Sequence, residues 1–183
     1  MRFLLVLMFA LSVVGNTRVN HAQGPTILEI ADAIHQHREE TEKEIVEDFF
    51  ELLSLPNVAT SLSDMEKNAE HIQKLLEPRG FEVRTLRSGG APYVFAELVT
   101  PGAKETILVY AHFDGQPVQT ENWAYPPFSP TLLSAPLQND GRLLDIANIT
   151  SGSFDPEWRI YARSAGDDKM PVIAIIHMLD ALR

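Results

Sequence analysis

The chain has 183 residues, with 15 lysine and arginine residues against 25 aspartate and glutamate residues, so its formal net charge is −10. This charge argues against a nucleic-acid partner, whose phosphates would be repelled. Cysteine is absent, so disulfides neither support nor oppose an oxidising compartment, and the length suffices for one ordinary domain with a core.

The first residues are typical of a secretory signal peptide. Met1 and Arg2 supply a positive charge, and residues 3–14 form an apolar run. The run is shorter than the roughly 20 residues that a membrane span needs, so no membrane span is expected. We predict a signal peptide over residues 1–22 and a secreted or periplasmic protein; the alternative is a short buried N-terminal helix.

Two helices are expected next, over residues 26–54 and 62–77. The first has Ile27, Ile30 and Ile34 on one side and charged residues around most of the rest.

We expect residues 23–40 to be a helical extension, with a break in the helix around residues 37–41. Charged pairs such as Glu39 with Lys43 are more typical of a solvated face than of a site.

The second half of the chain has the pattern of alternating strands and helices. Strands are expected near residues 81–87, 93–99, 106–111 and 158–162, and a helix near residues 168–182. The first two strands are joined by a glycine-rich connection, which predicts a hairpin. Residues 131–157 are predicted to be a surface excursion rich in turns. The pattern predicts an α/β protein, an α/β/α sandwich with a mixed sheet.

A first candidate motif follows the apolar run of residues 106–111. His112 and Asp114 are two residues apart, so on extended backbone their side chains point to the same side. The imidazole has the chemistry to bind a metal through one nitrogen while its other N–H donates to the carboxylate. Taken alone, the pattern is more typical of a hydrogen-bonded histidine followed by an ordinary turn, because three-residue patterns recur by chance.

A second candidate motif lies where the last strand passes into the last helix. Asp167 occurs at this junction, where open α/β sheets bind ligands. Pro171 is tolerated there because it falls in the first turn of the helix. The alternative for Asp167 is an N-cap that accepts hydrogen bonds from free backbone N–H groups.

The order of these motifs resembles a family of zinc metallopeptidases. The sequence has His-Phe-Asp-Gly-Gln-Pro over residues 112–117, then Trp123, then Pro-Phe-Ser-Pro over residues 127–130, then Ala-Arg-Ser-Ala-Gly-Asp-Asp-Lys over residues 162–169. It is similar to the pattern of carnosinase-type dipeptidases, aminoacylase, succinyl-diaminopimelate desuccinylase and glutamate carboxypeptidases. The resemblance covers residues 41–183, which we expect to be the N-terminal portion of a truncated catalytic domain of the zinc-exopeptidase type.

The resemblance implies a role for each of three residues. His112 would be a ligand of one zinc ion, Asp167 would bridge two zinc ions, and Asp114 would be the catalytic-site residue that orients His112. In the family the two ions activate a water that attacks the scissile amide carbonyl. The family's general base and remaining ligands have no counterpart after Asp168, and we expect His177 on the outer face of its helix, without a role.

Several positions depart from the family pattern. Ala162 and Ser164 stand where the family has glycine, which matters if the turn needs a positive φ. Met170 replaces another common glycine. Aromatic residues including Trp123 are candidates for the border of a substrate cleft, as are Tyr125 and Phe128, although packing within the loop explains them equally well.

The sequence thus predicts part of an exported zinc-dependent exopeptidase or amidohydrolase that acts on peptide or N-acyl amino acid bonds, inactive by itself. The alternative is a catalytically dead metal-binding or interaction domain, because hydrolytic zinc normally has three protein ligands and a water. The specific substrate and the oligomeric state do not follow from the sequence.

Overall fold

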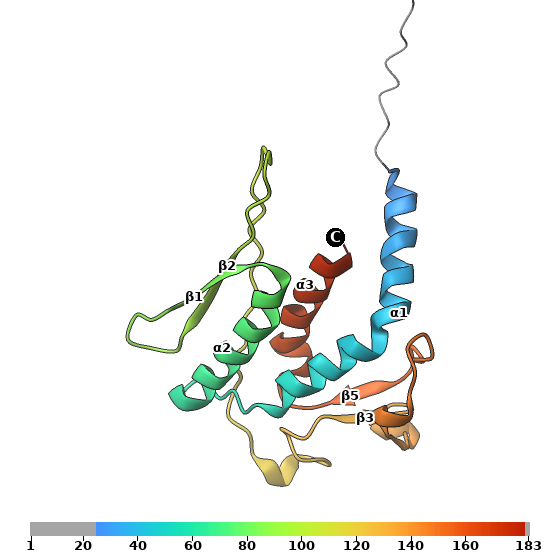
Figure 1. The fold of residues 1–183 in the computed structure, drawn as a ribbon. Coiled ribbons are helices and arrows are strands. Elements are labelled where there is room, and N and C mark those ends of the chain that lie inside the picture. The colour runs from blue at the N-terminus through green and yellow to red at the C-terminus, as the bar shows by residue number, and fades with distance from the viewer. Residues whose placement is uncertain (1–24, 182–183) are drawn as a thin grey trace, which may run out of the picture.

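The computed structural model describes residues 25–181, which fold into three α-helices and five short strands (Figure 1). The predicted signal peptide lies outside the described residues. The helices are α1 (Ile27–Ser54), α2 (Leu62–Leu76) and α3 (Met170–Ala181). The strands are β1 (Glu82–Leu86), β2 (Tyr93–Glu97), β3 (Thr131–Leu133), β4 (Leu143–Leu144) and β5 (Arg159–Tyr161). The predicted α/β class is confirmed, and within the described part no helix is long and apolar enough to cross a membrane.

Helix α1 begins with a capping box and continues to its end without a break. Thr26 and Glu29 bond to each other's backbone N–H groups, which satisfies donors that the first turn leaves free. The predicted interruption near residues 37–41 is instead a change of direction within one helix (Figure 1). The Thr41 hydroxyl donates to the carbonyl of His37 at 2.7 Å, and such bonds to the preceding turn often bend helices. The predicted start of the catalytic domain at residue 41 falls inside this helix.

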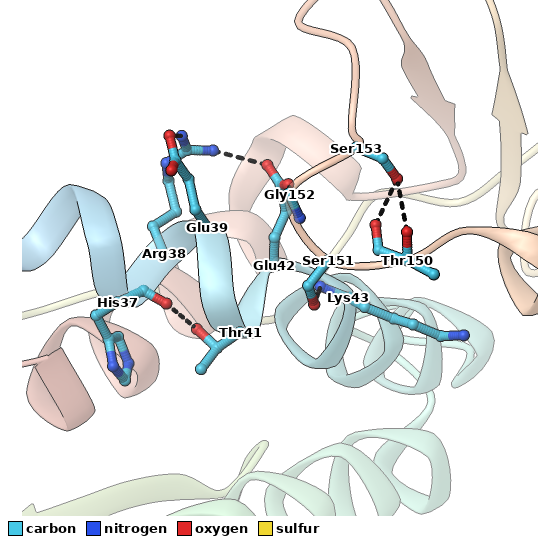
Figure 2. A network of polar contacts seen from close by, with 10 residues as sticks. All are labelled: His37, Arg38, Glu39, Thr41, Glu42, Lys43, Thr150, Ser151, Gly152 and Ser153. Atoms are coloured by element: carbon cyan, nitrogen blue, oxygen red, sulfur yellow. Dashed lines mark hydrogen bonds and ion pairs between the residues drawn. The ribbon is translucent and has the colours of Figure 1, made fainter.

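The middle of α1 is attached to the loop over residues 147–153 (Figure 2). The Gly152 N–H donates to the Glu42 carboxylate at 3.2 Å, and the Lys43 ammonium donates to the Ala147 carbonyl at 3.3 Å. Lys43 also pairs with Glu47 at 3.8 Å. These contacts lie on exposed surface, so the charged stretch of α1 makes surface contacts, as expected.

The hydrophobic core forms where the second half of α1 packs against α2 and α3. Its buried members are Phe49, Leu52, Leu53, Ile72, Leu76, Val172, Ile173 and Ile176. The hairpin of β1 and β2 adds Val83, Val94 and Ala96 from one face. This antiparallel hairpin confirms the prediction for residues 81–99.

A second antiparallel sheet has the order β4-β3-β5. Leu132 pairs with Leu144 on one side and with Ile160 on the other. Leu132 and Leu133 are buried, so the prediction of a surface excursion over residues 131–157 is wrong at its start. The reason is that these apolar residues gain two strand neighbours that are distant in sequence.

The predicted buried strand over residues 106–111 is wrong. Ile107 and Leu108 are each 87% exposed, Tyr110 is 81% exposed, and no residue from 106 to 111 forms a strand. An apolar strand stays buried only when other strands flank it and helices cover its faces. Nothing within residues 25–181 pairs with this segment, so the apolar run alone does not produce the strand.

Candidate metal site

The loop that carries His112 is fixed to the connection between α1 and α2. The Gly115 N–H donates to the Asn57 carbonyl at 2.7 Å, and the Ala59 N–H donates to the Gly115 carbonyl at 3.1 Å. These bonds form an isolated parallel bridge between Val58 and Gly115. The loop is therefore held although the segment before it is not a strand.

Asn57 joins this loop to the one that carries Asp167. Its buried side-chain amide donates to the Phe113 carbonyl at 2.7 Å and to the Ser164 hydroxyl at 2.9 Å. Ser164 has a φ of 64°, in the left-handed region, so the turn does adopt the conformation that favours glycine. A Cβ on Gly115 would lie 2.5 Å from the Ser164 oxygen, so glycine is needed at residue 115 for this close approach.

Lys169 attaches the second loop to the core. Its side chain is fully buried, and Nζ donates to the carbonyl oxygens of Leu52 and Leu55, each at 2.7 Å. These carbonyls lie at the C-terminal end of α1, where backbone acceptors lack helical partners and attract a cation. Burial lowers the pKa of the Lys169 ammonium to about 7.

The two anchored loops bring the predicted site residues together. His112 Nδ1 lies 3.1 Å from Asp114 Oδ1, and His112 Nε2 lies 3.2 Å from Asp167 Oδ1. Helix α3 begins only at Met170, and the Asp167 carboxylate is 92% exposed beside the imidazole. The expected proximity of these side chains is confirmed; their roles as metal ligands stay predictions.

The donor pair fits part of a zinc shell. When Asp114 accepts from Nδ1–H, the lone pair of His112 Nε2 is left for a cation. Two ligands at 2.0–2.2 Å from a tetrahedral zinc ion lie about 3.4 Å apart, close to the 3.2 Å between His112 Nε2 and Asp167 Oδ1. Yet residues 25–181 contain no group of three or more histidine, cysteine, aspartate or glutamate side chains that could hold a metal.

Asp168 is a site residue that the sequence analysis missed. Its Oδ2 accepts from the backbone N–H of His112 at 3.1 Å and lies 3.8 Å from His112 Nε2. The Asp167–Asp168 peptide bond is cis. The two adjacent aspartates were the only sequence signal for this second carboxylate.

A hollow of about 430 Å³ lies over the site. Its lining includes His112, Asp114, Asp167, Trp123 and Arg163. Trp123 therefore borders the hollow as expected. Tyr125 and Phe128 are not among its lining residues.

The expectation that His177 lies on the outer face of α3 is wrong. Its side chain is 6% exposed, and Nε2 lies 3.0 Å from the Asp48 carboxylate on α1. Asp180 pairs with Arg79 at 2.7 Å in the same cluster. His177 faces inward because Asp48 supplies a polar partner for its ring between the helices.

No family model matches the chain. It is 30% identical over 91 residues to the Cys-Gly metallodipeptidase dug1 of Schizosaccharomyces pombe. The aligned region covers 49% of this chain and 14% of that protein.

Two solved structures resemble the fold. The di-peptidase Dug1p from Saccharomyces cerevisiae has a TM-score of 0.62 and 19% identity, over 82% of this chain and 30% of that one. The M20 family metallo-carboxypeptidase Sso-CP2 from Sulfolobus solfataricus has a TM-score of 0.52 and 27% identity, over 75% of this chain and 27% of that one. The chain thus spans less than a third of the length of these proteins. The similarities support the M20 peptidase family and, through it, a metal cofactor; they do not single out any of the members named in the sequence analysis.

Proposed function

We propose that this chain forms the N-terminal part of the catalytic region of an exported zinc-dependent exopeptidase or amidohydrolase. The observation that carries the proposal is the convergence of three side chains at one hollow. His112 lies 3.1 Å from Asp114 in its own loop and 3.2 Å from Asp167, which comes from a loop distant in sequence. The substrate would be a peptide or an N-acyl amino acid. The likeness to the yeast dipeptidases and the archaeal carboxypeptidase supports this class.

Each residue of the site would have its own role. His112 and Asp167 would hold zinc, and Asp114 would keep the imidazole in the tautomer whose Nε2 faces the ion. Zinc at this place would polarise the amide carbonyl and supply a nucleophilic water at neutral pH. Asp168 would fix the backbone of His112, and Lys169 would hold the loop of both aspartates against α1.

The described residues also favour a second candidate, a metal-binding or interaction domain without catalysis. Its support is that no three donor side chains within residues 25–181 form a group that could hold a metal, whereas hydrolytic zinc normally has three protein ligands. By the same reasoning, the 183-residue chain alone is expected to leave amide bonds intact with zinc, cobalt or manganese. Chelator-sensitive turnover of a dipeptide by the pure chain would contradict this expectation.

The activity of the gene product, purified from the cells that naturally make it, distinguishes the two candidate functions. The tagged product, purified and supplied with zinc, is expected to release an amino acid from dipeptides or N-acetyl amino acids. His112→Ala and Asp167→Asn should abolish release, and Asp140→Asn, an exposed carboxylate at a distant turn, should retain it. A product that binds zinc through His112 without any turnover would support the binding domain instead.

Export is a separate part of the proposal and has a separate test. A reporter fused after Gly24 should appear outside the cytoplasm, on a chain shortened by roughly 15–23 residues, as removal of a signal peptide requires. Mass spectrometry that finds Met1 intact in exported material would contradict a cleavable signal.

A further inference from the structure

Three carboxylates surround the imidazole of His112. Asp114 lies 3.1 Å from Nδ1, whereas Asp167 and Asp168 lie 3.2 Å and 3.8 Å from Nε2. The ring carries at most a single positive charge, so negative charge remains in excess among these side chains. Like charges at such short range repel one another. Other contacts must therefore hold the loop of His112 against the loop of Asp167.

Asn57 makes contacts of this kind with both loops. Its side chain is fully buried, and Nδ2 donates to the Phe113 carbonyl at 2.7 Å and to the Ser164 hydroxyl at 2.9 Å. Phe113 directly follows His112 in one loop. Ser164 comes three residues before Asp167 in the other loop. A single amide group therefore joins the two loops.

The side-chain amide of Asn57 acts only as a donor. Nδ2 uses its two hydrogens for the two loops, whereas the buried Oδ1 has no hydrogen-bond partner within residues 25–181. Exchange of the nitrogen and oxygen positions would place Oδ1 against the Phe113 carbonyl, where two acceptors repel each other. A buried oxygen without a partner is costly. The contribution of the Asn57 side chain to the fold is therefore its two donated bonds.

Two further hydrogen bonds join the loops at less buried positions. Arg163 Nε donates to the Gln116 carbonyl at 3.0 Å, and the His112 N–H donates to the Asp168 carboxylate at 3.1 Å. Water competes for these bonds, because neither is fully buried. Asn57 differs from both in that it binds the two loops at once from a buried position on a third segment, the connection between α1 and α2.

We propose that Asn57 is a positioning residue of the candidate metal site. Its amide holds His112 Nε2 and Asp167 Oδ1 at the separation of 3.2 Å that suits two ligands of one zinc ion, against the repulsion among the carboxylates. This role deepens the proposed function and rests on it, because Asn57 would prepare the site for the metal. The separation of the loops is measured without zinc or turnover, so the two can fail independently.

Spin labels on the full chain measure the separation of the loops. The chain contains no cysteine, so Gln116→Cys and Gly166→Cys introduce one labelling site in each loop. Both positions are exposed, and a Cβ on Gly166 meets nothing within 4 Å. With chelator present, double electron–electron resonance on the labelled chain should give one narrow distance distribution. Asn57→Leu, which keeps the branched shape but donates no hydrogen bond, should broaden this distribution and shift it to longer distances.

The shift should depend on salt. The side chains of Asp114 and Asp167 are 44% and 92% exposed, so ions screen the repulsion between them. Raising the ionic strength should therefore reverse part of the shift in Asn57→Leu and leave the parent unchanged. A general loosening of the fold would not respond to salt in this way.

Ser164→Ala breaks the same bridge from the other side and keeps the test available if Asn57→Leu does not fold. It should lengthen the distance as Asn57→Leu does, and the double variant should lengthen it no further, because both changes remove one link. Ile72→Ala is the control, since it removes a buried side chain of α2 and destabilises the core without touching either loop. Its distance distribution should match that of the parent, and circular dichroism checks that each variant is folded.

Zinc titration supplies a second measurement. Asn57→Leu should weaken zinc binding about tenfold, as expected for the loss of a group that orients ligands, and Ile72→Ala should bind as the parent does. An unchanged distance in Asn57→Leu and Ser164→Ala, or an equal shift in Ile72→Ala, would overturn the role of Asn57. A shift that salt does not reduce would overturn the opposition to carboxylate repulsion. If the loops separate as expected but the parent binds no zinc, the proposed function fails while the bridge stands.

Discussion

The buried ammonium of Lys169 lies 2.7 Å from the carbonyl oxygen of Leu52, at the end of α1. This contact ties the loop of Asp167 and Asp168 to the core helix. A charge within a buried contact makes the stability of the fold depend on pH.

The first prediction concerns that dependence. Burial lowers the pKa of Lys169 from 10.5 to about 7 in the folded chain, so between these values the unfolded chain binds one more proton. The free energy of unfolding should therefore rise with pH from about 7 toward 10.5, by at most about 1.4 kcal/mol per pH unit from this group. Below pH 7 the group should contribute no slope.

Urea unfolding across this pH range measures the effect. Lys169→Met should remove the contribution from the slope, and Lys104→Met, at an exposed lysine, should preserve it. Parallel pH profiles for all three proteins would show that Lys169 keeps an ordinary pKa.

The second prediction concerns the approach of Gly115 to Ser164. Gly115→Ala should destabilise the fold by about 1–3 kcal/mol, the usual cost of overpacking, because the new Cβ would lie 2.5 Å from the Ser164 oxygen. Gly90→Ala is the control, since a Cβ there meets nothing within 4 Å. Adding Ser164→Gly should recover part of the loss in a double-mutant cycle; strictly additive effects would contradict the contact.

The third prediction separates the backbone strain of Ser164 from its hydrogen bond. Ser164→Ala loses the bond from Asn57 and keeps a side chain at positive φ, whereas Ser164→Gly loses the bond and relieves the φ. The glycine variant should therefore be more stable than the alanine variant by roughly 1 kcal/mol. Thermal unfolding of the two proteins compares them; an alanine variant of equal or higher stability would exclude the strain.

The fourth prediction concerns His177 and Asp48. His177→Ala should lower the free energy of unfolding by about 2–3 kcal/mol, because it removes a buried ring and a hydrogen-bond partner of the Asp48 carboxylate. Met178→Ala, on the exposed side of α3, should cost less than about 1 kcal/mol. Equal losses in the two variants would contradict the buried contact between α1 and α3.

The parts of the fold that the sequence predicts are those that depend on local patterns. The hairpin follows from two alternating segments around a glycine-rich turn, and Gly89 there has a φ of 84°. The run at residues 106–111 has the composition of a strand, but pairing depends on neighbours that composition does not reveal. His177 likewise faces inward because of Asp48, which is distant in sequence.

The site was predictable only in part for the same reason. Spacing placed His112 and Asp114 on one side of the chain, but the approach of Asp167 followed from the family resemblance. The groups that hold the site in place lie elsewhere in the chain. Asn57 lies between α1 and α2, and the carbonyl groups that bind Lys169 lie at the end of α1. Their side chains give no local signal, because each acts on a backbone group far along the sequence.

Zinc titration of the full chain, followed by calorimetry and by NMR of the histidine ring nitrogens, tests the metal site most directly. Zinc should shift the Nε2 signal of His112. Asp114→Asn should weaken binding about tenfold through loss of the orienting carboxylate, Asp167→Asn should weaken it at least as much, and Asp140→Asn should leave it unchanged. A zinc affinity equal in all four proteins, or a His112 ring signal that zinc does not move, would contradict the account.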